Sequence, residues 1–266
     1  MTQLEGHLRR RLEAGSKLLV PYVVAGIPSR DLMRDVLRSL ADTGDAIEIG
    51  LPYSDPVMDG PLIAAAAQRA IAGGVGPLDA LSLGEDAGIP RVAMTYYNPI
   101  HRLGEAEFCL RLTGSGFAGL IVPDLPFEES TSLRRACADY GIAWIPLVAP
   151  TSPDDRVRAL TETATGFVYA VSTLGVTGVR ATLSERAERV VGACRAYTDL
   201  PVLVGIGVST PEQAVEACAW ADGVVVGTAV VRLLIEEGIA AAGEFLTGVR
   251  RGLDGLAESR SAPRSA

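Results

Sequence analysis

From Pro201 to Gly227 the chain reads PVLVGIGVSTPEQAVEACAWADGVVVG, two valine-rich runs separated by one segment with helix signals. The runs PVLVG and GVVVG are apolar and bounded by glycine, which is typical of strands buried on both faces. Between them, Thr210 can cap a helix, Pro211 suits its first turn, and Gln213 completes a capping box. A strand, a helix and a second strand in this order predict two parallel strands joined by a crossover.

The same unit recurs along the whole chain. Eight apolar runs alternate with segments of helical pattern, each long enough to return the chain to the same end of a sheet. These runs are LLVPYVV from Leu18, AIEIG from Ala46, RVAMTY from Arg91, GLIVPD from Gly119, IAWIPLV from Ile142, FVYAVS from Phe167, PVLVGIG from Pro201 and GVVVG from Gly223. Eight parallel strands favour an α/β fold closed into a single (β/α)8 TIM barrel, although the pattern alone also permits an open sheet.

We expect the barrel domain to cover residues 1–256. The helix predicted before Leu18 is extra to the repeat and could close the bottom of the barrel. Residues 257–266, AESRSAPRSA, read as a disordered C-terminal tail.

Composition limits the function classes. Twenty-four basic against 32 acidic residues give a net charge of -8, which disfavours nucleic acid or an anionic membrane as the main partner. No run approaches the roughly 18 apolar residues that cross a bilayer, and the first residues lack a signal peptide's apolar centre. We therefore expect a cytoplasmic protein. The four cysteines are scattered singly along the chain, with no CxxC pair. We therefore expect them to be reduced core residues and not metal ligands: Cys109, Cys137, Cys194 and Cys218.

The second predicted strand carries a carboxylate in an unusual place. In AIEIG, alternation puts Ile47 and Ile49 against helices and aims Glu48 into the barrel. A structural Glu paired with a buried base is the alternative, but this strand and its loop supply no Lys or Arg. A carboxylate in such a cleft is typical of acid–base catalysis.

Glycines at the ends of later strands indicate an anion site. Gly205 and Gly207 follow the seventh run, and Gly227 with Thr228 follows the eighth and leads into a helical pattern. Backbone N–H groups exposed at glycines and at helix N-termini bind phosphate without lysine, and the ends of strands seven and eight are the usual place in such barrels. Together with Gly178, after strand six, they form the predicted phosphate cradle.

The stretch EIGLPYSDPVMDGP, residues 48–61, resembles the signature of the tryptophan synthase alpha chain family. Taken singly, Asp55-Pro56 and Asp59-Gly60 are ordinary turn dipeptides, so the combination carries the likeness. The resemblance extends from about Leu12 to Gly238, through segments such as MTYYNP from Met94, PDLP from Pro123, GVTG from Gly175 and GIGVS from Gly205.

The resemblance implies a lyase that cleaves indole-3-glycerol phosphate to indole and glyceraldehyde 3-phosphate. Carried over by position, Glu48 transfers the proton, Asp59 holds the indole N–H, and Tyr169 lies near the same proton transfer, unless it only fills the barrel. The implied indole pocket, equally suited to a barrel core, consists of Tyr22, Met94, Tyr96 and Ile121. The family needs no metal or organic cofactor for this reaction.

The resemblance also implies a partner, the beta chain of an alpha2beta2 complex in tryptophan biosynthesis. Two departures qualify it: residues 73–90 are shorter than expected, leaving little room for the third helix, and Thr173 replaces a common Arg. A free-standing lyase of a specialised indole pathway therefore stays open, as does a catalytically silent barrel that activates a partner. A different phosphate-binding barrel, such as a sugar-phosphate isomerase, is a more distant alternative.

Overall fold

The computed structural model of the chain describes residues 1–83, 87–171, 183–205 and 207–261. Its strands are β1 (Leu18–Val24), β2 (Ile47–Gly50), β3 (Arg91–Met94), β4 (Phe117–Ile121), β5 (Ala143–Trp144), β6 (Leu147–Val148), β7 (Val168–Val171), β8 (Val202–Gly205) and β9 (Gly223–Val226). Its helices are α1 (Gln3–Glu13), α2 (Met33–Ala41), α3 (Pro61–Ala72), α4 (Pro77–Leu81), α5 (Tyr97–Leu103), α6 (Glu105–Gly114), α7 (Thr131–Asp139), α8 (Asp154–Thr163), α9 (Leu183–Arg195), α10 (Pro211–Ala217), α11 (Thr228–Glu236) and α12 (Ile239–Ser261), with a 3-10 turn at Phe127–Glu129.

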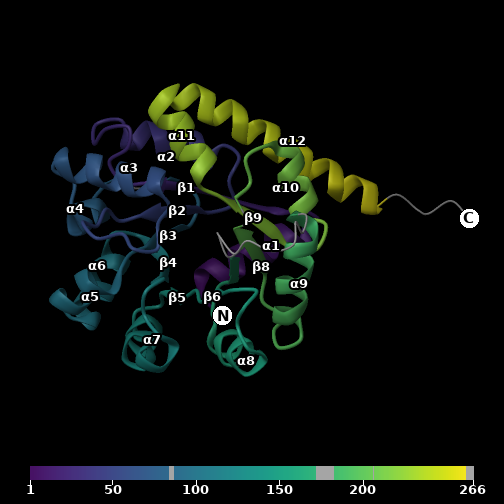
Figure 1. Cartoon of the computed structure of the whole chain (residues 1–266), viewed down its shortest axis with the longest axis horizontal. Helices are drawn as coiled ribbons and strands as arrows, with labels where there is room; N and C mark the ends of the chain where they lie inside the picture. The colour runs from purple at the N-terminus through teal and green to yellow at the C-terminus, as the bar shows by residue number, and fades with distance from the viewer. Residues whose placement is uncertain (84–86, 172–182, 206, 262–266) are drawn as a thin grey trace, which may run out of the picture.

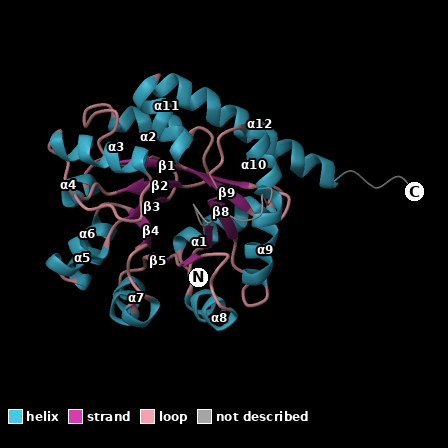
Figure 2. Ribbon diagram, in the orientation of Figure 1, coloured by secondary structure: helices cyan, strands magenta, loops and turns pink. Residues whose placement is uncertain are grey.

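The strands form one parallel sheet in the order β5-β4-β3-β2-β1-β9-β8-β7-β6. The two strands at the ends of this order, β5 and β6, follow each other in the chain and are separated by Ile145 and Pro146. The sheet therefore closes on itself, and Figures 1 and 2 show the helices arranged around it. This arrangement confirms the predicted (β/α)8 barrel.

The fifth predicted strand is divided into β5 and β6 by a proline. The Ile145 N–H donates to the Leu120 carbonyl on β4 at 3.1 Å, and the Tyr169 N–H on β7 donates to the Pro146 carbonyl at 3.1 Å. Pro146 itself has no N–H to donate, so the regular ladder is interrupted there. Eight predicted strands thus appear as nine.

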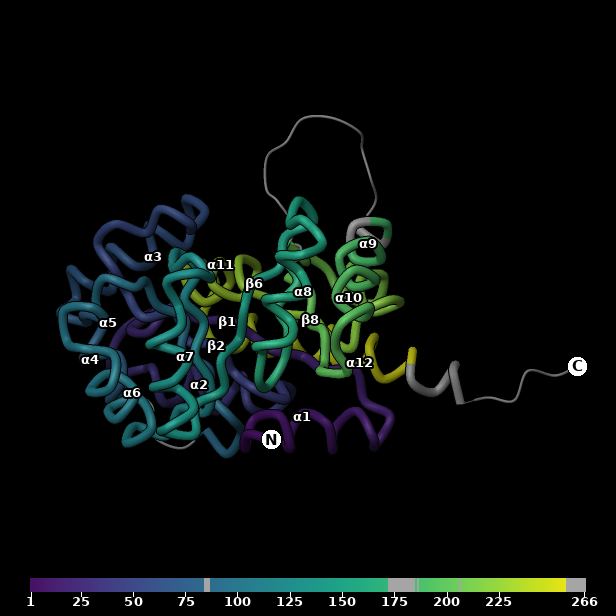
Figure 3. Tube along the Cα trace, turned by 90° about the horizontal axis from the view of Figure 1, so that it is seen from below, coloured from purple at the N-terminus to yellow at the C-terminus, as the bar shows by residue number. Residues whose placement is uncertain are grey.

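Helix α1 lies across one end of the barrel, as Figures 1 and 3 show from two directions. Leu4 and Leu8 are fully buried on its inner face. A Cβ atom built on Gly119 or Gly166 would come within 3.0 or 3.1 Å of the Leu4 side chain, so Leu4 packs directly against the backbone at the amino ends of the barrel strands. The prediction of an extra N-terminal helix that closes the bottom is confirmed.

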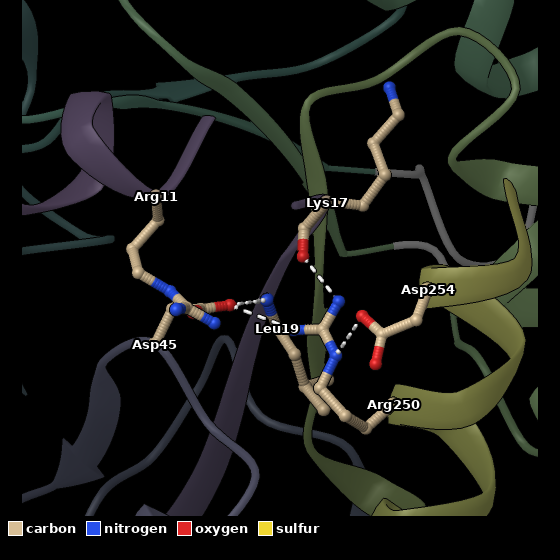
Figure 4. Close-up of polar contacts among 6 residues, drawn as sticks. All are labelled: Arg11, Lys17, Leu19, Asp45, Arg250 and Asp254. Carbon is tan, nitrogen blue, oxygen red and sulfur yellow. Dashed lines mark hydrogen bonds and ion pairs between the residues drawn. The ribbon is translucent and has the colours of Figure 1, made fainter. Parts of the chain in front are cut away.

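A buried carboxylate joins both ends of the chain to this end of the barrel (Figure 4). Asp45, just before β2, is 1% exposed. Its carboxylate forms ion pairs with Arg11 Nε of α1 at 2.5 Å and with Arg250 Nη1 of α12 at 3.0 Å. The Leu19 N–H of β1 donates to the same carboxylate at 2.8 Å. Arg250 also pairs with Asp254 at 3.0 Å. Asp45 therefore connects α1, β1, β2 and α12.

Two further features concern the predicted boundaries. The segment between β2 and β3 contains α3 and, in place of a full third helix, the five-residue α4. Helix α12 packs against α10, α11 and α2 and continues to Ser261, past the predicted domain end at residue 256. Where the barrel domain ends stays a prediction. Among the described helices, none combines the length and apolar character needed to cross a membrane.

Candidate active site

Glu48 points into the barrel, as its position in β2 predicts. Its strand neighbours in register are Tyr22 on β1 and Val92 on β3, so these three side chains share one face of the sheet. The negative charge of Glu48 also raises the pKa of Tyr169 on β7, a strand that is not adjacent to β2. The charge of Glu48 therefore acts on Tyr169 across the barrel interior.

The Glu48 carboxyl has a strongly raised pKa. It is 1% exposed, and among the described residues its Oε2 has no hydrogen-bond partner. Burial, and then the negative charge of Asp59, raise the pKa of Glu48 to about 8. A carboxyl with this pKa carries a proton at neutral pH and can release it during a reaction.

Asp59 lies on the loop after β2, and Tyr96 fixes that loop. The Met58 N–H donates to the Tyr96 hydroxyl oxygen at 3.0 Å. Asp59 is half-buried; burial raises its pKa, and a hydrogen bond with the Tyr96 side chain partly offsets that effect. The Tyr96 ring is stacked on Tyr53 with centroids 5.2 Å apart. Tyr96 thus joins the end of β3 to two places on the loop after β2, at Tyr53 and at Met58.

The residues that follow β3 hold the neighbouring loops together. The Asn98 side chain donates to the Tyr53 hydroxyl at 2.8 Å, which ties α5 to the loop after β2. The Tyr97 N–H donates to an Asp124 oxygen at 2.9 Å, which ties the start of α5 to the loop after β4. Residues of the MTYYNP and PDLP segments therefore connect the loops after β2, β3 and β4 to one another.

Two tyrosines reach into the barrel mouth over glycines. A Cβ atom on Gly50 would overlap the Tyr22 hydroxyl, and one on Gly205 would overlap the Tyr169 hydroxyl. Only glycine leaves room for each ring at these strand ends. Burial, followed by nearby negative charges, raises the pKa of both Tyr22 and Tyr169 well above the usual value, so both remain protonated.

The predicted apolar wall occupies interior positions. Register pairs Gly50 with Met94 and Met94 with Ile121, so Met94 and Ile121 share the interior face of Glu48. Met94 is half-buried and Ile121 is fully buried. Tyr96, 4% exposed, lies just beyond this strand. The structure brings these residues to the same end of the barrel as Glu48, and their role in binding indole stays a prediction.

The predicted phosphate residues lie at the ends of the adjacent strands β8 and β9. Gly207 has a left-handed φ of 77°, and a Cβ there would meet nothing within 4 Å. Gly227 is the N-terminal cap of α11, and Thr228 is the exposed first residue of that helix. The remaining residue of the predicted cradle, Gly178, lies outside the described residues, as does Thr173.

The helix after β8 begins as its sequence predicts, with one difference. The Thr210 side chain accepts a hydrogen bond from the Gln213 N–H at 3.3 Å. The Gln213 side chain, however, accepts from the Ser209 N–H at 2.7 Å and not from Thr210. The loop between Gly207 and α10 is thereby held in a defined conformation.

A separate cavity of about 580 Å³ opens at the opposite end of the barrel, beside α1. It is lined by residues such as His7, Arg91 and Ser115, which lie at the amino ends of β3 and β4 or on α1. Active sites of such barrels lie at the carboxyl ends of the strands. This cavity is therefore distinct from the site around Glu48.

Sequence reasoning missed two relationships in the site. It assigned Tyr22 and Tyr96 only to the indole wall, whereas Tyr96 also bonds the Asp59 loop and Tyr22 lies beside Glu48. Strand alternation places Tyr22 and Glu48 on the same face of two neighbouring strands, so it could have revealed that the two residues are adjacent. The first depends on how the loop folds back, which strand periodicity does not encode.

Comparison with known proteins gives one consistent answer. Residues 8–249 match the family described as tryptophan synthase alpha chain. The Streptomyces avermitilis tryptophan synthase alpha chain is 43% identical over 252 residues, covering 90% of this chain and 91% of the relative. The Synechocystis alpha chain is 45% identical over 235 residues, covering 86% of this chain and 88% of the relative.

Solved structures agree with the sequence relatives. A structure of Mycobacterium tuberculosis tryptophan synthase superposes with a TM-score of 0.87 at 38% identity, covering 95% of this chain and 98% of that one. The tryptophan synthase alpha subunit of Legionella pneumophila superposes with a TM-score of 0.87 at 30% identity, covering 96% and 99%. The chain that places Glu48 inside this barrel therefore belongs to the tryptophan synthase alpha chain family.

Proposed function

We propose that this chain cleaves indole-3-glycerol phosphate to indole and glyceraldehyde 3-phosphate, as the alpha subunit of a tryptophan synthase. Membership of the family supports a carbon–carbon lyase of tryptophan biosynthesis. The observation that carries the residue assignment is the buried Glu48 carboxyl, whose pKa of about 8 suits a group that gives and takes a proton near neutral pH.

Glu48 performs both proton transfers of the cleavage. Its carboxyl protonates C3 of the indole ring, which turns the ring into an indolenine able to accept a pair of electrons. The resulting carboxylate then removes the proton of the adjacent glycerol hydroxyl. The bond between C3 and the glycerol chain breaks, its electrons restore the indole, and the oxygen becomes the aldehyde. Glu48 ends in its protonated form, ready for the next substrate.

Asp59 stabilises the positive charge that develops on the ring nitrogen. As a carboxylate it accepts the indole N–H and lowers the energy of the indolenine. The hydrogen bond between Tyr96 and Asp59 and the bond from the Met58 N–H to Tyr96 orient this group. Tyr169, whose ring lies over Gly205 and within the field of Glu48, assists the same proton transfer.

The two ends of the substrate are bound by different parts of the mouth. The indole ring packs against Tyr22, Met94, Tyr96 and Ile121. The phosphate is received by the backbone at Gly205, Gly207 and Gly227, by the start of α11 at Thr228, and by Gly178. The N-terminus of α11 supports this placement because its free N–H groups and dipole favour an anion.

The chain also binds a beta chain that consumes the indole. Val57 and Met58, on the loop that carries Asp59, are 78% and 59% exposed. Two apolar side chains on the rim of a catalytic loop suit burial by a partner, which would order that loop and raise turnover. We place the activity in the cytoplasm, which fits a structure whose described cysteines form no disulfide bond.

Substitution of Glu48 tests the reaction. Glu48→Gln keeps the side-chain shape but cannot release a proton, so kcat for indole formation should fall by at least about 100-fold while KM changes little. Glu107→Gln is the matched control: this half-buried glutamate of α6 pairs with Arg111 of the same helix, so its substitution should leave turnover unchanged. Near-normal turnover of Glu48→Gln would refute the acid–base assignment.

Addition of a beta chain tests the subunit role. The isolated chain should release indole slowly, and a cognate beta chain should raise that rate by about tenfold or more. Fast turnover that a beta chain does not change, with no complex on size-exclusion chromatography, would favour the free-standing lyase. Absence of turnover under both conditions would favour the catalytically silent barrel.

A further inference from the structure

The position of Tyr22 is set by two glycines. A Cβ atom on Gly227 would lie 3.3 Å from Cδ1 of Tyr22, and one on Gly50 would overlap its hydroxyl. The ring therefore leans from the β9 side of β1 across to β2, with its hydroxyl over Gly50. Gly50 is two residues beyond Glu48, on the same interior face of β2. The hydroxyl thus lies next to Glu48, on its mouth side.

The ionisable groups around this hydroxyl are acids and tyrosines from four segments. Glu48 of β2 and Asp59 of the following loop both act on Tyr22 through their charges, as does Tyr96 beyond β3. Tyr169 of β7 is influenced by both Glu48 and Tyr22. Of these groups none is a cation. Tyr22, 8% exposed, stays protonated and can only offer its O–H to a neighbouring carboxylate.

Glu48 needs such a donor when it becomes charged. Among the described residues its Oε2 is buried without a hydrogen-bond partner. This is tolerable while the carboxyl is neutral, but a buried carboxylate without donors is strongly destabilised. The proposed reaction makes Glu48 a carboxylate between its two proton transfers. A hydroxyl adjacent to it in register would stabilise that form.

We propose that Tyr22 is a positioning residue of the reaction, whose hydroxyl donates a hydrogen bond to the Glu48 carboxylate after the proton has moved to indole C3. The inference rests on the proposed acid–base role of Glu48 and extends it. Tyr22 transfers no proton itself; it stabilises the charged form of Glu48 and orients it toward the glycerol hydroxyl. Its ring remains part of the apolar wall.

Tyr22→Phe separates these two roles, because the ring between Gly50 and Gly227 is kept and only the hydroxyl is lost. We expect kcat to fall about tenfold with little change in KM. Loss of a donor to the charged form raises the pKa of Glu48, so the limb of kcat/KM that falls with rising pH should move up by about one pH unit. A purely structural role would leave this limb in place.

Three further variants complete the experiment. Tyr197 lies two residues after α9, and its hydroxyl donates to Asp154. Tyr197→Phe removes a tyrosine hydroxyl outside the site and should change neither kcat nor the limb of the pH profile. Tyr22→Phe added to Glu48→Gln should lower kcat no further, because the double variant has no Glu48 carboxylate for the Tyr22 hydroxyl to stabilise. Equal melting temperatures of wild type and Tyr22→Phe would show that folding is intact.

The outcomes are distinguishable. A Tyr22→Phe enzyme with an unchanged pH limb and kcat within about twofold of wild type would overturn the inference while Glu48→Gln remains inactive. An active Glu48→Gln enzyme would instead overturn the proposed function. An equal loss from Tyr22→Phe in both backgrounds would show that the hydroxyl acts on something other than Glu48, which also overturns the inference.

Discussion

The backbone N–H of Met58 donates a 3.0 Å hydrogen bond to the hydroxyl oxygen of Tyr96, so the loop that carries Asp59 is fixed to the end of β3 through its main chain. The side chains of Val57 and Met58 on this loop are largely exposed and can make other contacts. The catalytic loop is therefore positioned from the barrel side and open on the other side.

Removal of the Tyr96 hydroxyl should loosen Asp59 without disturbing the ring stack on Tyr53. For Tyr96→Phe we expect kcat/KM for indole release to fall about tenfold, equivalent to the loss of one hydrogen bond of about 1.4 kcal/mol. Tyr97→Phe is the control, because the Tyr97 hydroxyl bonds Glu105 between α5 and α6. Equal kinetics for the two variants would show that the Tyr96 contact does not position Asp59.

Glu48 should make the protein less stable as pH rises. Its pKa is about 8 in the folded protein against 4.5 for an unperturbed Glu. Between these values the folded state keeps a proton that the unfolded chain releases, so this group lowers the free energy of unfolding by at most about 1.4 kcal/mol per pH unit.

Glu48→Gln isolates this effect, because glutamine does not titrate. The stability of the variant relative to wild type should increase as pH rises from 4.5 to about 8 and then level off. Urea unfolding at several pH values measures the difference at each. A difference that does not vary with pH would mean that Glu48 titrates normally in the folded protein.

Loss of the Asp45 carboxylate should destabilise the barrel strongly. Asp45→Ala leaves Arg250, whose side chain is 13% exposed, without its buried partner, and we expect the free energy of unfolding to fall by about 3 kcal/mol. Asp254→Ala removes the other carboxylate on Arg250, which is 54% exposed, and should cost less than about 1 kcal/mol. Similar effects of the two substitutions on urea unfolding would contradict this ranking.

A side chain at Gly207 should weaken binding of the phosphate more than binding of the indole. Gly207→Ala has space for its Cβ but adopts a left-handed φ of 77° at a cost of about 1–2 kcal/mol, so the loop should shift. We expect a higher KM for indole-3-glycerol phosphate and little change for unphosphorylated indoleglycerol. Equal losses for both substrates would place the phosphate elsewhere.

The repeated strand pattern was sufficient to predict eight parallel strands, because each apolar run marks its strand independently of the others. It favoured a barrel but also permitted an open sheet, and the structure decides for the barrel. Period-two alternation likewise predicted the direction of Glu48. The break at Pro146 was not predicted, since the run IAWIPLV is apolar throughout and the ladder is lost through one missing N–H.

Contacts between distant segments were beyond the sequence pattern. Cys109 and Cys137 were taken as isolated residues, yet α6 and α7 bring their sulfur atoms to 3.9 Å, with both thiols free. The pairing of Asp45 with Arg11 and Arg250 is of the same kind. Each depends on how helices pack around the barrel, which local periodicity does not specify.

The Asp45 contacts have a consequence for the order in which the protein is completed during synthesis. Arg11 emerges from the ribosome before Asp45, whereas Arg250 belongs to α12 and emerges after every described strand. A nascent chain that already contains every strand thus still lacks one of the two arginines that neutralise this buried carboxylate. Synthesis of α12 supplies it, so this buried carboxylate gains its second arginine only after all nine of those strands have been made.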